Sequence, residues 1–342
     1  MNKAGPMIAA EGLAKRYGKT RALTGVDFAV PAGTVLGMLG PNGAGKTTAV
    51  RILTTLALPD AGRASVAGID LLKHPGEVRR YIGVAAQDTT LDALLTGRQN
   101  LVMVGELSGM GRAPSTARAA ELLAQFDLVD AADRVLKGYS GGMRRRLDLA
   151  ASLMTRPPVL FLDEPTTGLD PTGRQAVWDV IRELVGEGVT VLLTTQYLDE
   201  ADALAHRIVV VDHGKVIAEG TPQELKEASR NARVAVTLAA PHAGAVDAIA
   251  PLVASRVDMS DDGRRLSAGV DATPGLATAL VRALDAAGVL VDNIEVRHPS
   301  LDDVFFALTG GHIADDGPEG GRGIAPALHG AGNEHEPREL GT

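Results

Sequence analysis

Eight consecutive residues, Gly40-Pro-Asn-Gly-Ala-Gly-Lys46-Thr47, have the glycine spacing and the lysine–threonine pair of a phosphate-binding loop. The loop follows the apolar run Val35–Leu39, which suits a buried strand, and opens a predicted helix over 46–56. Glycines let backbone N–H groups approach a phosphate closely, and a helix N-terminus adds a positive dipole. We therefore expect Lys46 to bind β- and γ-phosphates and the Thr47 hydroxyl to bind Mg²⁺. A plain glycine-rich turn is the alternative.

A second apolar run, Val159–Leu162, ends in two acidic residues, Asp163 and Glu164. The carboxyl ends of the strands in a parallel sheet face the ligand crevice, so both carboxylates are expected beside the phosphate-binding loop. Asp163 is placed to hold Mg²⁺, directly or through water, and Glu164 to act as general base for an attacking water. The alternative is a pair of acids that forms a solvated helix cap.

Between these two motifs lies the pentapeptide Tyr139-Ser-Gly-Gly-Met143, at the start of a predicted helix. Ser140 suits the N-cap of that helix, because a serine hydroxyl accepts a hydrogen bond from the backbone at this position. A helix N-terminus also attracts anions. The segment is therefore a second candidate site for a phosphate group.

These three segments, in this order, resemble those of ATP-binding cassette (ABC) transporter ATPases, whose middle segment is a signature usually written LSGGQ. The resemblance implies an α/β fold, a P-loop ABC ATPase cassette with a parallel-sheet core, an antiparallel β subdomain and a helical subdomain. It implies ATP and Mg²⁺ as cofactors and a head-to-tail dimer, in which Ser140, Gly141 and Gly142 of one subunit bind the ATP of the other. Since one chain has one loop and one signature, we expect a homodimer in the assembled transporter.

The resemblance assigns further residues to the site. It implies ATP contacts from the loop and from an aromatic residue that stacks on adenine: Tyr17, Gly40, Pro41, Asn42, Gly43, Ala44, Gly45, Lys46, Thr47 and Thr48. Tyr17 has an alternative interpretation as an ordinary tyrosine at a strand end. Gln87 occupies the Q-loop position, which touches Mg²⁺ and reports to the membrane partner, and Asp170 occupies the D-loop position at the dimer interface.

Some positions depart from the family pattern. The switch residue, normally histidine, is Gln196, which can donate a hydrogen bond to the γ-phosphate but cannot titrate near neutral pH. We expect Lys46, Glu164 and Gln196 to be the catalytic residues. In the signature, Met143 replaces the usual glutamine and Tyr139 the usual leucine.

The segments YSGGMRRRLDLA, LLTTQYLDEAD, LTGRQNL and HPSLDDVFFALTG resemble the daunorubicin/doxorubicin-resistance type of ATPase subunit, over residues 8–309. This implies the energy-coupling subunit of an exporter for hydrophobic drugs, antibiotics or lipids. The subunit would lie at the cytoplasmic face of the cell membrane, bound to a separate integral-membrane permease. The resemblance also implies an assembly role for a C-terminal segment, Leu301, Asp302, Asp303, Val304 and Phe305. An amphipathic helix that closes a small domain is the alternative.

Apolar periodicity and turn signals predict the elements around these motifs. Short strands are predicted over 8–30 and 62–86, helices over 92–135, and alternating strands and helices over 159–211, which favours a parallel, doubly wound sheet. Beyond residue 230 the order of elements resembles a ferredoxin-like domain. We therefore divide the chain into a nucleotide-binding domain (1–230, helical subdomain about 88–150), a small α+β assembly or regulatory domain (231–309) and a disordered tail (310–342).

Composition limits the classes of function. The chain has 342 residues, no cysteine and a net charge of −8, which exclude a disulfide scaffold and argue against a protein that coats nucleic acid. No membrane span or signal peptide is predicted, and the eight histidines lack metal-ligand spacing, so no zinc is expected. Two alternatives remain: a soluble ABC ATPase acting on nucleic acid or ribosomes, and a non-hydrolysing module that sequesters a drug.

Three consecutive arginines, Arg144–Arg146, follow the signature. Such a run is typical of the solvated face of a helix. Electrostatic help for the ATP phosphates across the dimer is the alternative.

Overall fold

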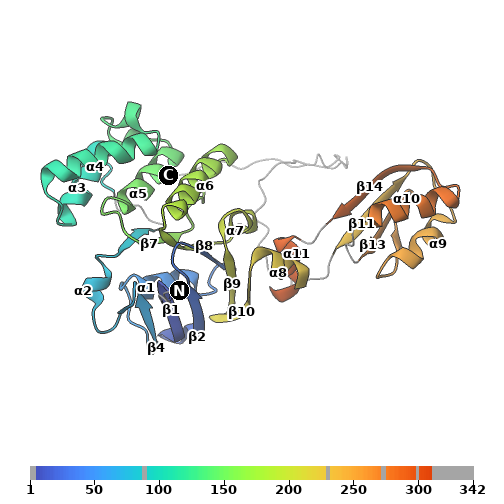
Figure 1. Ribbon diagram of the computed structural model, residues 1–342, viewed down its shortest axis with the longest axis horizontal. Helices are drawn as coiled ribbons and strands as arrows, with labels where there is room; N and C mark the ends of the chain where they lie inside the picture. The colour runs from blue at the N-terminus through green and yellow to red at the C-terminus, as the bar shows by residue number, and fades with distance from the viewer. Residues whose placement is uncertain (1–4, 87–90, 229–231, 271–274, 298–299, 310–342) are drawn as a thin grey trace, which may run out of the picture. The chain divides into compact units, whose positions relative to one another are not determined.

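A computed structural model describes residues 5–86, 91–228, 232–270, 275–297 and 300–309 (Figure 1). The expected tail, 310–342, and the expected Q-loop residue Gln87 lie outside these ranges. None of the helices that the structure describes combines the length and the hydropathy of a membrane span.

A six-stranded sheet forms the centre of the cassette, in the order β10-β9-β3-β8-β7-β6. The strands from β6 to β9 pair in parallel, and β10 pairs antiparallel with β9. Every residue of β3, β7 and β8 is buried, because helices and a second sheet cover both faces, and this explains their continuous apolar runs. The parallel core was predicted correctly; the strands are β3 (Val35–Leu39), β6 (Ile82–Ala85), β7 (Val159–Asp163), β8 (Thr190–Thr195), β9 (Arg207–Asp212) and β10 (Lys215–Gly220).

A second, antiparallel sheet has the order β2-β1-β4-β5. Its long hairpin turns at Gly18, whose φ of 57° lies in the region that favours glycine. The buried side chains of this sheet share one core with helix α1 and with β3 and β7 of the central sheet. Its strands are β1 (Ile8–Tyr17), β2 (Thr20–Val30), β4 (Ala61–Val66) and β5 (Ile69–Asp70), and the neighbouring helices are α1 (Lys46–Leu53) and α2 (Pro75–Val78).

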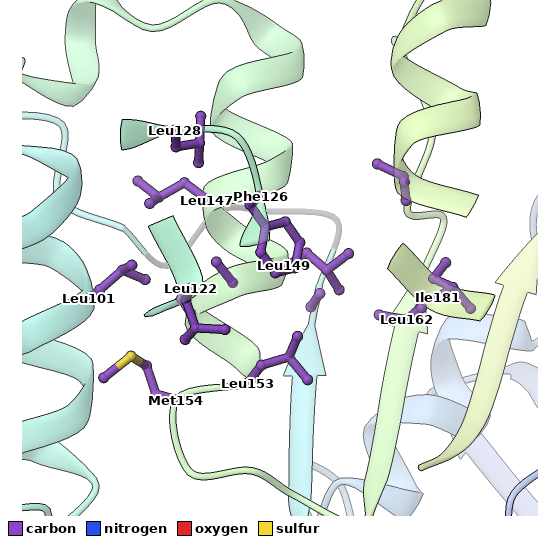
Figure 2. Close-up of a cluster of buried hydrophobic side chains, with 14 of the residues drawn as sticks. Leu101, Leu122, Phe126, Leu128, Leu147, Leu149, Leu153, Met154, Leu162 and Ile181 are labelled. Atoms are coloured by element: carbon purple, nitrogen blue, oxygen red, sulfur yellow. The ribbon is translucent and has the colours of Figure 1, made fainter. Parts of the chain in front are cut away.

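The helical part contains α3 (Gly97–Leu107), α4 (Arg112–Gln125) and α5 (Gly141–Ser152), with short 3₁₀ turns η1 (Val129–Ala131) and η2 (Leu136–Gly138). Thr96 and Gln99 form a capping box that starts α3. Figure 2 shows the apolar side chains of this part gathered together, among them Leu101, Phe126 and Leu147. The same cluster continues to β7 and to α6 (Pro171–Gly186), so α5 is packed directly against the central sheet.

Helices α7 (Leu198–Leu204) and α8 (Pro222–Ala228) complete the cassette, and an antiparallel sheet of the order β12-β13-β11-β14 follows it. This is the strand order of a ferredoxin-like β-α-β-β-α-β domain, as predicted. Figure 1 shows α9 and α10 beside the sheet, and their apolar side chains share one core with β11 and β13. The elements are β11 (Arg233–Leu238), α9 (Ala245–Ile249), η3 (Ala250–Leu252), β12 (Asp258–Met259), β13 (Arg265–Gly269), α10 (Leu276–Ala286) and β14 (Val291–Arg297).

The last helix, α11 (Leu301–Thr309), packs on the cassette and not on the small sheet. Its side chains Leu301, Val304 and Phe305 are buried in one cluster with residues of α7, α8 and β9. Burial of apolar surface against these elements stabilises the helix where it lies. Closure of the small domain, the simpler of the two sequence interpretations, is therefore wrong for this helix, and three of its five proposed assembly residues face the cassette.

Candidate nucleotide-binding and hydrolysis site

The phosphate-binding loop connects the end of β3 to the start of α1, as predicted. At two of its glycines there is no room for a side chain. A Cβ at Gly40 would collide with the carbonyl oxygen of Val211, and one at Gly45, whose φ is 113°, with that of Ala22. The loop therefore holds its backbone close to two neighbouring segments, and the N–H groups of the first turn of α1 are left to receive an anion.

Lys46, the first residue of α1, is 4% exposed and lies over this loop. Its Nζ donates hydrogen bonds to the carbonyl oxygens of Gly40 at 2.6 Å and Pro41 at 3.2 Å. Nζ is also 4.0 Å from Oε1 of Glu164. Burial lowers the pKa of Lys46, while the charges of Glu164 and Asp163 act in the opposite direction. A buried cation is thus held between the loop and two carboxylates.

Asp163 ends β7 and is 4% exposed. Its Oδ1 accepts a hydrogen bond from the hydroxyl of Thr47 at 3.4 Å and a second one from the hydroxyl of Thr194 on β8. A carboxylate beside a hydroxyl, at the edge of a phosphate-binding loop, is the oxygen donor set that Mg²⁺ takes together with phosphate oxygens. The described residues contain no cluster of three or more His, Cys, Asp or Glu that could hold a metal by itself.

Glu164 immediately follows β7, and its backbone has a left-handed conformation with a φ of 50°. Its backbone N–H donates to the carbonyl oxygen of Thr194 at 3.0 Å, and its Oε2 accepts a hydrogen bond from Thr167 at 3.3 Å. The acidic pair is not a helix cap, since Asp170 caps α6 by accepting a hydrogen bond from Gly173 N at 2.9 Å. Its two carboxylates instead meet the loop lysine and threonine.

The signature segment starts α5. Ser140 is the N-cap, and its hydroxyl accepts a hydrogen bond from Met143 N at 3.2 Å, as predicted. Ser140 and Gly141 are exposed, so the end of this helix is open to a ligand or partner. Tyr139 is 4% exposed, and its hydroxyl donates to Ala131 O at 2.6 Å, which explains how a tyrosine fits in place of leucine.

Two of the remaining expected site residues are exposed at strand ends. Tyr17 ends β1 and is 47% exposed, with the ammonium of Lys15 5.5 Å from its ring centroid. Gln196 follows β8 directly and is exposed. The loop residues Asn42, Gly43 and Thr47 are exposed as well, whereas Gly40, Ala44, Gly45 and Lys46 are buried.

The sequence interpretation missed two buried groups beside the site. One is Thr194, whose contact with Asp163 forms only when β7 and β8 pair. The other is Arg145, which was interpreted as part of a solvated arginine run or as a residue facing ATP. It is 9% exposed and bound to the protein's own backbone, because it lies on the face of α5 that packs against the sheet. The acidic residue three positions later, Asp148, was the available signal, since it faces the same side of the helix.

The comparisons with known proteins identify the family of this chain. The family model described as ABC transporter matches residues 23–167. Daunorubicin resistance ATP-binding protein DrrA3 of Streptomyces coeruleorubidus is 54% identical over 304 residues, which are 89% of this chain and 96% of that protein. Nod factor export ATP-binding protein I of Ralstonia nicotianae is 38% identical, over 91% of this chain and 96% of that protein.

Solved structures match the cassette. An ATP-binding subunit of an ABC transporter superimposes with a TM-score of 0.59 at 27% identity, over 65% of this chain and 92% of that chain. A dimeric ATP-binding cassette in a post-hydrolysis state, bound to ADP and Pi, matches with a TM-score of 0.58 at 26% identity, over 63% and 98%. With the phosphate-binding loop, the acidic pair and the signature in place, this chain belongs to the ATP-hydrolysing subunits of ABC transporters, in the daunorubicin/doxorubicin-resistance group.

Proposed function

We propose that this chain hydrolyses ATP at a site built from the phosphate-binding loop, the acidic pair and the signature of a second copy. The observation that carries the assignment is the meeting of Lys46 with Glu164, at 4.0 Å, at the mouth of the loop. Lys46 supplies the fixed charge for the phosphates. Glu164 orients the attacking water and takes its proton.

Mg²⁺ is proposed as the cofactor, held by the hydroxyl of Thr47 and by Asp163, directly or through water. Both groups point at one place, since the hydroxyl lies 3.4 Å from the carboxylate oxygen. When bound, the ion neutralises the charge that develops on the phosphate oxygens. The sequence also assigned Gln87 to this ion; that residue lies outside the described ranges.

The proposed assembly is a head-to-tail homodimer. Ser140, Gly141 and Gly142 of one copy complete the site of the other, and Asp170 lies at the interface between them. The exposed start of α5 supports this arrangement, since a helix N-terminus attracts anions and this one is open to a phosphate held by another copy. Only ATP provides the γ-phosphate that bridges the copies, so hydrolysis releases the dimer.

The proposed transport substrate is a hydrophobic drug or antibiotic of the anthracycline class, moved by a separate membrane permease at the cytoplasmic face. The support is similarity: relatives named for daunorubicin or doxorubicin resistance are 46–54% identical, whereas the Nod factor exporters are 37–38% identical. Lipid-like substrates are the second possibility within the same class of exporter.

The test has two steps. The tagged chain is purified from detergent-solubilised membranes of its own cell, and its partners are identified by mass spectrometry. We expect a polytopic membrane protein without an ATPase cassette; soluble proteins or ribosomes alone would contradict the proposal. Cells that express the chain with that partner should then accumulate less daunorubicin, and a Lys46→Ala variant should restore accumulation. Equal daunorubicin accumulation in cells with the wild-type chain and in cells with the Lys46→Ala variant would reject this drug class.

A further inference from the structure

A single buried guanidinium connects three segments of the site. Arg145 Nε donates to Pro165 O at 2.7 Å, and Nη2 donates to Asp163 O at 2.9 Å and to Glu164 O at 3.0 Å. Nη1 donates to Ala86 O at 2.6 Å and to Asp148 Oδ2 at 3.3 Å. A guanidinium has five N–H donors. All five therefore have an acceptor within the protein.

Three of these acceptors are consecutive carbonyls, those of Asp163, Glu164 and Pro165, which form the turn after β7. Glu164 has the left-handed backbone of this turn, which a non-glycine residue keeps only when its surroundings hold it. Arg145 holds the turn on its carbonyl side, and the backbone and hydroxyl oxygens of Thr194 accept from the Glu164 N–H at 3.0 and 3.3 Å. The direction of the Glu164 side chain depends on both contacts.

The other two acceptors place this turn in a larger unit. Asp148 lies one turn further along α5, and Ala86 immediately precedes Gln87. Because Ser140 caps the same helix, the signature, the residue before Gln87 and the Glu164 turn are fastened to one side chain. A shift of α5 by an ångström would strain or break several of these bonds at once.

We propose that Arg145 is a positioning residue for ATP hydrolysis, which fixes the backbone of Glu164 and couples it to the signature helix. The inference rests on the proposed role of Glu164 as base. Because the protein itself accepts all five of its hydrogen bonds, Arg145 has no donor left for the nucleotide. It acts by keeping the Glu164 carboxylate where the attacking water must lie, and it moves that carboxylate when α5 moves.

The direct test is Arg145→Lys in the full chain. A lysine keeps the charge but offers three donors from one nitrogen in place of a planar fork, so it cannot bind all five acceptors. We expect kcat for ATP to fall about tenfold or more, while KM changes by less than about threefold, because only the reacting geometry is lost. Arg118→Lys is the matched control: Arg118 Nη2 donates to Leu153 O at 3.2 Å, beyond the far end of α5, and this variant should keep kcat.

Two measurements distinguish a positioning role of Arg145 from a purely structural one. They are the turnover per folded molecule and a double-mutant cycle with Glu164→Gln. If Arg145 acts through Glu164, adding Arg145→Lys to Glu164→Gln should not lower the residual rate further. Additive losses, or an unchanged kcat in folded Arg145→Lys, would overturn the proposal. If the lysine variant does not fold, Arg145→Gln replaces it, and failure of both to fold would assign Arg145 to the fold alone. Full activity of Glu164→Gln would instead reject the base assignment itself.

Discussion

Thr194 donates a hydrogen bond from its hydroxyl to Oδ1 of Asp163, the same oxygen that the Thr47 hydroxyl reaches at 3.4 Å. Thr194 is fully buried on β8, and its hydroxyl oxygen also accepts from Glu164 N at 3.3 Å. One side chain thus orients the carboxylate assigned to Mg²⁺ and holds the backbone of the residue assigned as base.

Replacing Thr194 by valine should therefore weaken Mg²⁺ binding more than it weakens the fold. Each of the two hydrogen bonds lost with the hydroxyl costs about 1 kcal/mol of unfolding free energy. The Mg²⁺ concentration for half-maximal ATPase activity should rise several-fold. Thr190→Val is the control, since Thr190 lies on the same strand and accepts a hydrogen bond from Gly33 N at 2.9 Å, away from the acidic pair. Equal Mg²⁺ titrations for both variants would refute the orienting role.

The glutamine at position 196 leads to a prediction about how the KM for ATP depends on pH. Glutamine does not titrate, so the pH dependence of a Gln196→His variant should depart from that of the wild type where imidazole gains a proton, near pH 6.5. Charge-assisted hydrogen bonds to phosphate are stronger than neutral ones, so the KM for ATP of the variant should fall relative to the wild type as pH drops through this range. A KM ratio that stays constant from pH 5.5 to 8 would show that residue 196 does not contact the phosphate.

Glu200 on α7 leads to a prediction about how the stability of the fold depends on pH. It is fully buried, and its Oε1 accepts a hydrogen bond from Trp178 Nε1 at 3.2 Å. Burial raises the pKa of this carboxyl above the ordinary value of 4.5. Between pH 4.5 and the raised pKa, the folded chain therefore holds a proton that the unfolded chain releases, so this contribution to stability is complete below pH 4.5 and is lost as pH rises.

A Glu200→Gln variant cannot titrate and keeps an oxygen for Trp178. Its unfolding free energy relative to the wild type should increase between pH 5 and pH 8, as measured by chemical denaturation. Glu187→Gln, an exposed residue at the end of α6, should show no such trend. A difference that stays flat or reverses would show that Glu200 is not protonated in the folded state.

Local sequence was sufficient for the elements that carry their own signals. The glycines and the strand before Lys46 predicted the loop, and the serine before Gly141 predicted the start of α5, because these features depend on neighbours within a few residues. The helix after the loop ends at Leu53, earlier than the predicted Leu56, since Thr55 turns the chain with a φ of 63°.

Contacts between distant segments could not be predicted in this way. Thr194 and Arg145 act on Asp163 and Glu164 from a neighbouring strand and a neighbouring helix, and only the packed sheet brings them together. The position of α11 could not be predicted for the same reason. Its apolar stripe indicated a buried face but not which part of the chain would cover that face. The amphipathic pattern was correct, and the partner came from the tertiary structure.

The most direct test of the account is the assembly state of Glu164→Gln with Mg·ATP, measured by light scattering during size exclusion. The substitution removes the base but leaves the lysine and the loop, so ATP should stay bound and trap a dimer with two nucleotides. Adding Ser140→Asp should abolish that dimer, because aspartate still caps α5 but repels the γ-phosphate of the facing copy. A Glu164→Gln chain that stays monomeric with ATP bound, or that hydrolyses ATP at the wild-type rate, would contradict the account.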